Sequence, residues 1–101
     1  MLEPVVGPTT GPIAIDPEKP VVIGRSSTCQ VILADESVSR RHAQVHHTNG
    51  TWFITDLGSR HGTHVNMTPL AANGAAPLSN GDLVLLGPWT FRVRTGEVGA
   101  N

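Results

Sequence analysis

The chain of 101 residues is poor in cysteine, aromatic residues and long apolar runs. Its single cysteine, Cys29, cannot form an internal disulfide, so nothing indicates the disulfide scaffold of a small secreted domain, and a reducing, cytoplasmic (intracellular) location is expected. No apolar stretch is long enough to cross a bilayer, and none has the form of a signal-peptide core. We therefore expect no membrane insertion.

Charge is scarce as well, at 15% charged residues and a formal net charge of −1. Domains that bind nucleic acid broadly are usually basic, so a nucleic-acid partner is not expected. Lysine occurs once, at Lys19, and most arginines lie in one part of the chain, residues 24–66. The four in that part are Arg25, Arg40, Arg41 and Arg60. A local cationic patch on a nearly neutral chain favours a small anionic ligand.

A helical repeat of apolar residues is also missing, whereas turn formers are abundant, with 11 glycines and 8 prolines. Short runs that alternate apolar and polar residues, or that are rich in β-branched residues, predict strands. The expected fold is therefore all-β, in one domain over residues 1–95, with a C-terminal tail or linker at 96–101.

The predicted strands are short and closely spaced. Asn49-Gly50 is the strongest hairpin signal in the chain. Residues 67–77, with several alanines and two prolines, are expected to form a variable surface loop. Strands are predicted over residues 2–6, 13–15, 21–23, 31–33, 43–47, 51–55, 63–66, 83–86 and 89–93.

Three polar segments follow or precede these strands: residues 24–26 (Gly-Arg-Ser), 39–42 (Ser-Arg-Arg-His) and 56–66. They are rich in Arg, Ser, Thr and Gly. An arginine offers a planar fork of donors, a hydroxyl donates and accepts, and glycine lets backbone N–H groups come close to a ligand. These residue types together are typical of a phosphate-binding site.

Gly-Arg at 24–25, Ser-x-x-His at 39–42, Asp-x-x-Ser-x-x-Gly-Thr-x-x-Asn at 56–66 and Gly-Asp…Gly at 81–87 resemble, in that order, the forkhead-associated (FHA) domain family. The similarity covers roughly residues 5–94. It implies an FHA-like β-sandwich of short, mostly antiparallel strands with ligand loops at one end. It also implies a module that binds phosphothreonine peptides in kinase-linked signalling. The implied partner is a Ser/Thr kinase substrate, and neither catalysis nor a cofactor is expected.

The resemblance assigns ligand contacts to a set of residues on the three segments. His61 departs from the family pattern, because many phosphothreonine-binding members have Asn there to hold the ligand backbone. Neutral histidine still offers one donor and one acceptor. Binding is expected to tighten as the pH falls toward about 6, although protonation of the phosphate opposes this. The expected phosphopeptide-binding residues are Arg25, Ser39, Arg40, Arg60 and His61.

A second set is expected to shape the loops rather than touch the ligand. In this reading Asp56 fixes a turn, Gly62 permits a backbone conformation that a side chain would forbid, and Asn66 ties two ligand-binding loops together. The expected supporting residues are Gly24, His42, Ser59, Gly62, Thr63 and Asn66.

Other functions fit the residue types less well. A scaffold or oligomerisation module of the same fold that needs no phosphate stays open. Ser39, His42 and Asp56 are the residue types of a hydrolase triad, but two of them lie only three positions apart and no nucleophile elbow precedes Ser39. The five histidines and Cys29 match no zinc spacing, so no metal site is expected.

Overall fold

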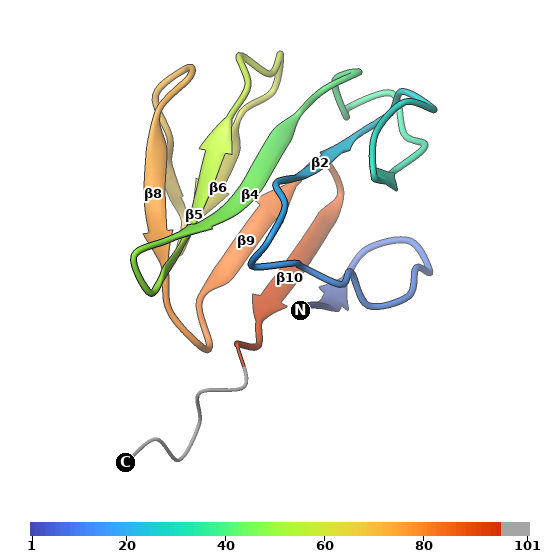
Figure 1. Ribbon diagram of the computed structural model, residues 1–101. Coiled ribbons are helices and arrows are strands. Elements are labelled where there is room, and N and C mark those ends of the chain that lie inside the picture. The colour runs from blue at the N-terminus through green and yellow to red at the C-terminus, as the bar shows by residue number, and fades with distance from the viewer. Residues whose placement is uncertain (96–101) are drawn as a thin grey trace.

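The computed structural model describes residues 1–95, so the predicted tail at 96–101 lies outside the described residues. Within them the chain forms strands and turns and no helix, which confirms the all-β prediction (Figure 1). The strands are β1 (Leu2–Val6), β2 (Val21–Gly24), β3 (Val31–Ile32), β4 (Ala43–Thr48), β5 (Thr51–Asp56), β6 (Thr63–Val65), β7 (Thr68–Pro69), β8 (Ala75–Leu78), β9 (Leu83–Leu86) and β10 (Trp89–Val93).

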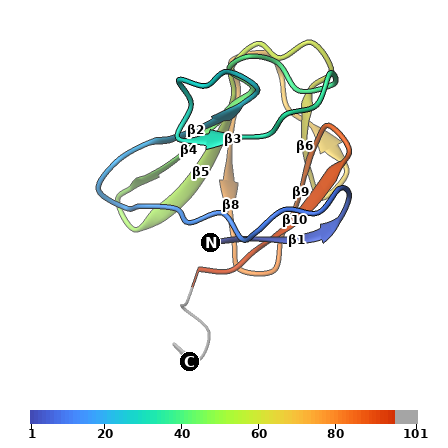
Figure 2. The same ribbon diagram turned by 90° about the vertical axis from the view of Figure 1, so that its right-hand side faces the viewer.

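The strands build two five-stranded sheets that face each other as a sandwich (Figure 2). One sheet has the order β1-β10-β9-β6-β7, and the other has the order β3-β2-β4-β5-β8. Neighbouring strands are antiparallel except β2 and β3, which are parallel. This is the predicted sandwich of short, mostly antiparallel strands.

The core lies between the sheets because alternate residues of each strand point inward. Along β5 the buried residues Trp52 and Ile54 alternate with half-buried neighbours, and along β10 Phe91 and Val93 do the same. Burying an aliphatic or Phe side chain contributes about 1.5–3 kcal/mol. Val38 is fully buried although it belongs to a loop, so the loop before β4 is anchored in the core.

Two tight turns have positive φ at both central residues, as a type I′ hairpin requires. Asn49 and Gly50, between β4 and β5, have φ of 50° and 80°, as the Asn-Gly pair predicts. Asn66 and Met67, between β6 and β7, have φ of 50° and 68°. This second turn was not predicted, because methionine rarely adopts the left-handed conformation.

Two predictions of local structure were wrong. Residues 67–77 are not one surface loop but include β7 and most of β8, which form one edge of each sheet. Residues 13–15 form no strand, since only Ile13 pairs, through an isolated bridge to Leu2. The alternation reflects packing of Ile13 in the core and of Ile15 against it rather than a continuous ladder.

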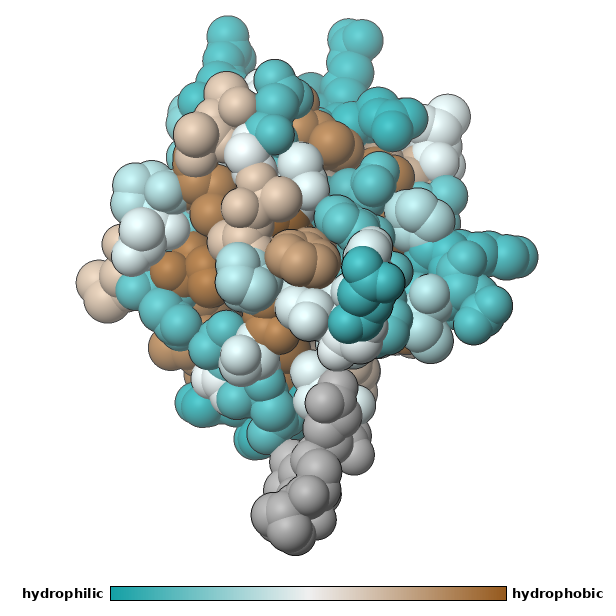
Figure 3. Space-filling view, turned by 60° about the vertical axis from the view of Figure 1, so that its left-hand side comes forward, coloured by the Kyte–Doolittle hydropathy of each residue, from teal (hydrophilic) through white to brown (hydrophobic). Residues whose placement is uncertain are grey.

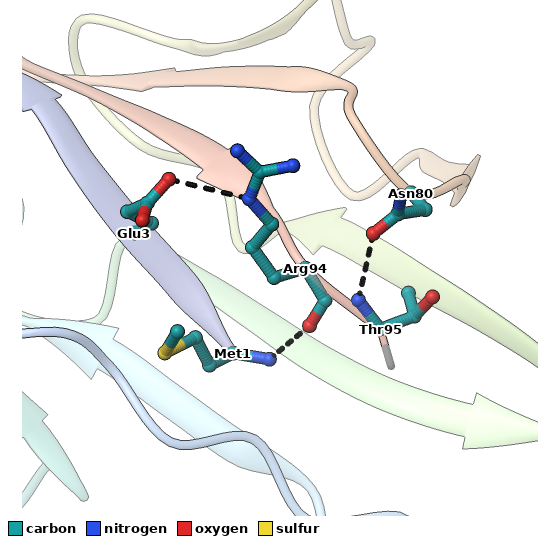
Figure 4. A network of polar contacts seen from close by, with 5 residues as sticks. All are labelled: Met1, Glu3, Asn80, Arg94 and Thr95. Carbon is teal, nitrogen blue, oxygen red and sulfur yellow. Dashed lines mark hydrogen bonds and ion pairs between the residues drawn. The ribbon is translucent and has the colours of Figure 1, made fainter. Parts of the chain in front are cut away.

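The two ends of the described chain are held together by β1 and β10 (Figure 4). The amino group of Met1 donates to the carbonyl of Arg94, and the Arg94 N–H donates to the Met1 carbonyl at 2.8 Å. Burial lowers the pKa of this amino group. The Arg94 side chain pairs with Glu3 at 3.3 Å, and the Thr95 N–H donates to Asn80.

The side of the sandwich that carries β8 shows apolar atoms between hydrophilic ones (Figure 3). Leu70, which follows β7, and Ala76 of β8 are half-buried and pack against the core. The part of the chain that the structure describes has no helix with the length and apolar character to cross a membrane.

Candidate functional site

The three polar segments meet at one end of the sandwich. The loops after β2, before β4 and after β5 lie together at the upper end of Figure 1, whereas the β4–β5 hairpin lies at the lower end. This arrangement follows from strand direction, because β2 and β5 finish at the end of the sheet where β4 begins.

The first two loops are joined by backbone hydrogen bonds that continue the β2–β4 pairing. The Arg25 N–H donates to the Ser39 carbonyl at 2.9 Å, and the Ser26 N–H donates to the Arg40 carbonyl at 3.1 Å. Gly24 is required here, because a Cβ on it would lie 2.1 Å from the Arg40 carbonyl oxygen. The glycine therefore sets how closely Arg25 approaches Ser39.

Arg25 uses only part of its guanidinium to hold its position. Its Nε–H donates to the carbonyl of Val38 at 3.1 Å, and Val38 is itself fully buried. The terminal Nη groups make no hydrogen bond or ion pair within residues 1–95, and the residue is exposed. A fixed Nε with free Nη donors is well suited to a bidentate contact with an anion.

The second and third loops meet at Ser39 and His42. The Arg60 N–H donates to Ser39 Oγ at 2.9 Å, which leaves the serine O–H able to donate to a ligand. His42 is fully buried, accepts from the Ser39 N–H at 3.0 Å through Nδ1 and contacts the Gly62 carbonyl at 2.9 Å through Nε2. Both contacts fit the neutral tautomer with its proton on Nε2, which donates to Gly62.

Asp56 organises the third loop. Its carboxylate accepts from the N–H groups of Gly58 and Ser59 and from the hydroxyls of Ser59 and Thr63. Burial by itself raises the pKa of this carboxyl, but the hydrogen bonds from Ser59, Thr63 and Gly58 outweigh it and leave the pKa below its usual value. Ser59 Oγ also accepts from the Gly62 N–H at 2.9 Å, and Gly62 has φ of 85°.

The rim of the site is cationic. Arg25, Arg40, Arg41 and Arg60 are all exposed. Among residues 1–95 the ion pair between Arg94 and Glu3, at the other end of β10, is the only one formed, so these four arginines have no carboxylate partner there. An uncompensated cluster of guanidinium groups attracts an anion. This attraction becomes stronger when the bound anion displaces water, because the local dielectric falls.

The structure thus brings Arg25, Ser39 and Arg60 to one place, with Arg40 beside them and His61 exposed on the same third loop. The expected supporting residues act as braces of that place, with one exception. The amide of Asn66 bonds to Asp82 at 3.1 Å and to the Leu83 N–H at 2.9 Å. It therefore ties the β6–β7 turn to the start of β9, so the predicted tie between ligand-binding loops was wrong.

Ser39, His42 and Asp56 do not form a catalytic triad. Both ring nitrogens of His42 are occupied by backbone groups, and the Asp56 carboxylate is occupied by the third loop. The Ser39 hydroxyl has Arg60 as its partner and lacks the histidine base that a nucleophile needs. Among residues 1–95 no group of three or more His, Cys, Asp or Glu is placed to hold a metal ion.

Sequence reasoning missed two features next to the site. The first is Cys29, which is buried. Its thiol donates to the Arg40 carbonyl at 3.1 Å and so helps to hold the loop before β4. No signal in the sequence pointed to it.

The second feature is a cavity of about 370 Å³ beside His61. Gly87, in the turn between β9 and β10, packs against this region so closely that a Cβ would lie 2.8 Å from Val38 and 2.9 Å from Ser37. The Gly87-Pro88 pair predicted a turn but not its contact with a distant loop. The cavity is lined by Ser37, His61, Gly62, His64, Leu85, Gly87 and Pro88.

Comparison with known proteins identifies the family. The FHA domain model matches residues 21–87, which include all three loops, and the chain belongs to the FHA domain family. Glycogen accumulation regulator GarA of Mycolicibacterium smegmatis is 34% identical over 90 residues, covering 89% of this chain and 55% of that protein. The probable E3 ubiquitin-protein ligase dma1 of Schizosaccharomyces pombe is 33% identical over 103 residues, covering 81% of this chain and 39% of that protein.

The chain therefore spans about half the length, or less, of these curated relatives. Among solved structures, one from a structural and functional analysis of phosphothreonine-dependent FHA domain interactions superposes with a TM-score of 0.68 at 34% identity. That match covers 75% of this chain and 76% of the other.

Proposed function

We propose that this domain binds phosphothreonine-containing segments of partner proteins, as a recognition module in kinase-linked signalling, and that it catalyses no reaction. The observation that carries the proposal is the meeting of Arg25, Ser39 and Arg60 at one point, fixed by the bond from the Arg60 N–H to Ser39 Oγ at 2.9 Å. Three loops from different parts of the chain meet there, and the arginines that they carry have no acidic partner among the described residues.

A phosphothreonine suits this arrangement. Its phosphate carries about −1.5 to −2 charges near neutral pH and several strong acceptor oxygens. The free Nη groups of Arg25 and the Ser39 hydroxyl donate to it, and the guanidinium groups of Arg40 and Arg60 add positive potential. Hydrogen bonds to charged groups contribute about 1.5–3 kcal/mol each, enough to make binding depend on the phosphate.

His61 and the cavity beside it give the peptide around the phosphothreonine a place to lie. The His61 ring offers one donor and one acceptor to a ligand backbone. The cavity of about 370 Å³ has polar walls at Ser37 and His64 and an apolar wall at Leu85. A side chain of the ligand that enters it adds sequence preference to the charge recognition.

The comparisons support this reading without extending it. The solved structure at 34% identity comes from work on phosphothreonine-dependent FHA interactions. GarA is a glycogen accumulation regulator by name, and dma1 is a probable ubiquitin-protein ligase. The match to this chain covers only 39% of the length of dma1. A ligase activity in that relative is therefore no reason to expect one in this domain.

The test is a screen with a library of seven-residue peptides that carry phosphothreonine at the centre. The tightest binder is then titrated by calorimetry in its phosphothreonine, phosphoserine and unmodified forms, against wild type, Arg25→Ala and Arg92→Ala. We expect binding of the phosphothreonine form, loss of most of it in Arg25→Ala and no change in Arg92→Ala, because Arg92 lies on β10 outside the loops. Equal binding of the unmodified peptide would instead favour a phosphate-independent scaffold.

A further inference from the structure

Three of the four sheet edges are closed by proline. The edge strands of the two sheets are β1, β7, β3 and β8. An edge with free N–H and C=O groups invites pairing with another strand, and proline prevents this because it has no N–H. Pro4 in β1, Pro69 in β7 and Pro77 in β8 each occupy an outward-facing position on their strand.

The hydrogen bonds of neighbouring residues show which way each proline faces. Along an edge strand, the backbone N–H and C=O groups of successive residues point alternately toward the partner strand and away from the sheet. Pro69 faces away from β6, since the next residue, Leu70, donates to β6. Pro77 faces away from β5, since Gly74, three residues earlier, accepts from β5.

In β1 the outward side is closed twice. Leu2 exchanges both of its backbone hydrogen bonds with Ile13, at 2.8 Å each, so this residue faces away from β10. Pro4, two positions on, faces the same way. The stretch after β1 therefore covers one end of this edge and the proline blocks the next position.

β3 is the edge left open. Leu33 donates to the Gly24 carbonyl of β2 at 2.8 Å, so the preceding residue, Ile32, directs its N–H and C=O away from the sheet. Ile32 is not proline, its backbone has no partner outside the sheet in the described part of the chain, and it is 52% exposed. An exposed β-branched residue on an unblocked edge is the feature that the other three edges avoid.

A groove of about 420 Å³ runs beside this edge. Its walls are β3 and the stretch before β2, which lie on the side of the molecule seen in Figure 2. None of its lining residues is charged, so it suits an uncharged and largely apolar occupant. The lining residues are Thr10, Gly11, Pro12, Ile13, Ala14, Val21, Gln30, Val31 and Ile32.

The β3 edge lies beside the end of β2, the strand that leads into the first phosphate-binding loop. Ile32 pairs with Gly24, and Arg25 is the next residue along the chain from that pair. A partner whose phosphothreonine sits at Arg25 and Ser39 therefore has the β3 edge one strand away from β2, the strand that ends at Gly24.

We propose that the β3 edge binds an extended, uncharged segment of the same partner protein that carries the phosphothreonine, as an added strand. This rests on the proposed function and names a second region of the same ligand. Main-chain hydrogen bonds to Ile32 would hold the segment, and alternate β-branched side chains would fill the groove. Because the phosphothreonine already holds the partner, the second contact forms at a high effective concentration and raises affinity even if it is weak alone.

The experiment extends the tightest seven-residue phosphothreonine peptide from the screen above. A Val-Thr-Val-Thr-Val block is added at its N- or C-terminal side through Gly-Ser spacers of two, four, six or eight residues. Matched peptides carry Gly-Ser in place of the block. Affinities are measured on wild type and on three variants: Ile32→Pro, which removes the outward N–H, Ile32→Lys, which keeps it and adds charge to the groove, and Ala75→Pro, which makes the same change on the β8 edge.

We expect the Val-Thr block on one side, at one spacer length, to raise wild-type affinity by about tenfold or more over its Gly-Ser match. The gain should survive in Ala75→Pro and vanish in both Ile32 variants, while all four proteins bind the unextended peptide equally. A block that adds nothing to wild type, or a gain that persists in Ile32→Lys, would overturn the proposal for the β3 edge alone. Failure of the unextended phosphopeptide to bind would instead reject the phosphothreonine function.

Discussion

The backbone N–H of Arg60 donates to the side-chain oxygen of Ser39 across 21 positions of sequence, at 2.9 Å. This bond joins the loop before β4 to the loop after β5, and it does so at the residue whose hydroxyl faces the proposed ligand. The Ser39 hydroxyl therefore accepts from the protein and is still free to donate its own proton. A single side chain both fixes the third loop and supplies a contact to the phosphate.

Replacement of Ser39 by alanine should weaken phosphopeptide binding while leaving the fold intact. The exposed N–H of Arg60 can turn to water, so the melting temperature should change little. Loss of one hydrogen bond to a charged phosphate costs about 1.5–3 kcal/mol, or roughly 10- to 150-fold in Kd. Calorimetry on Ser39→Ala checks this against Ser27→Ala, an exposed serine of the neighbouring loop. Equal loss in both variants would remove the special role of Ser39.

A lysine should not replace Arg25, although it keeps the charge. Arg25 donates through Nε to the Val38 carbonyl at 3.1 Å and leaves its Nη groups for the ligand. A lysine presents its three donors from a single nitrogen, so it lacks the rigid fork that reaches Val38 from Nε and the anion from the Nη groups. We expect Arg25→Lys to lose most of the affinity that Arg25→Ala loses, with Arg40→Lys, whose side chain has no such anchor, as the milder control. Wild-type binding by Arg25→Lys would show that charge alone is recognised.

Acid should weaken the brace that holds the third loop. The pKa of Asp56 lies below its usual value in the folded protein because its hydrogen bonds outweigh the effect of burial. The ionised carboxylate thus contributes stability above the usual aspartate pKa of about 3.9, and this is lost as the pH falls through the lowered value.

Urea unfolding of wild type and Asp56→Asn from pH 7 to pH 3 measures that contribution. The variant should be less stable at pH 7 by about 2–3 kcal/mol, since an amide cannot accept from all four donors. The difference should stay constant down to about pH 5 and then shrink below about pH 4. Glu36→Gln, an exposed acid in the loop before β4, is the matched control and should show neither effect. A gap that does not depend on pH would mean that Asp56 acts through packing alone.

The sequence predicted which loops meet at one end of the sandwich better than it predicted β7 and β8. Ser59 acts through turn chemistry inside the third loop, which leaves a readable local pattern. Gly24 and Ser39 contact other loops, and only the order of the family motifs identified them. Asn66 shows the limit of such reading. Its position in the motif was clear, but its partners Asp82 and Leu83 depend on how β6 and β9 lie next to each other.

The edge strands β7 and β8 escaped prediction for a related reason. β7 and β8 are two and four residues long and contain Pro69 and Pro77, which lower any strand propensity. They are strands only because β6 and β5 offer them a partner, which is a tertiary effect that single-sequence patterns do not contain. The same prolines mark them as edges once the pairing is known.

Met67 should be the easiest place to stabilise this domain. It stands at the second central position of the β6–β7 turn, with φ of 68°, and its side chain is 80% exposed. A left-handed conformation strains a methionine but not a glycine, and Asn-Gly is the favoured pair in a type I′ turn. We expect Met67→Gly to raise the free energy of unfolding by about 0.5–1 kcal/mol. Phosphopeptide affinity should not change, because the turn bonds to Asp82 and Leu83 and lies away from the loops of the site.

Gly50→Met, the reverse change in the β4–β5 turn, should destabilise by a similar amount, because Gly50 has φ of 80°. If Met67→Gly melts below wild type, backbone strain at Met67 does not lower the stability of the folded domain.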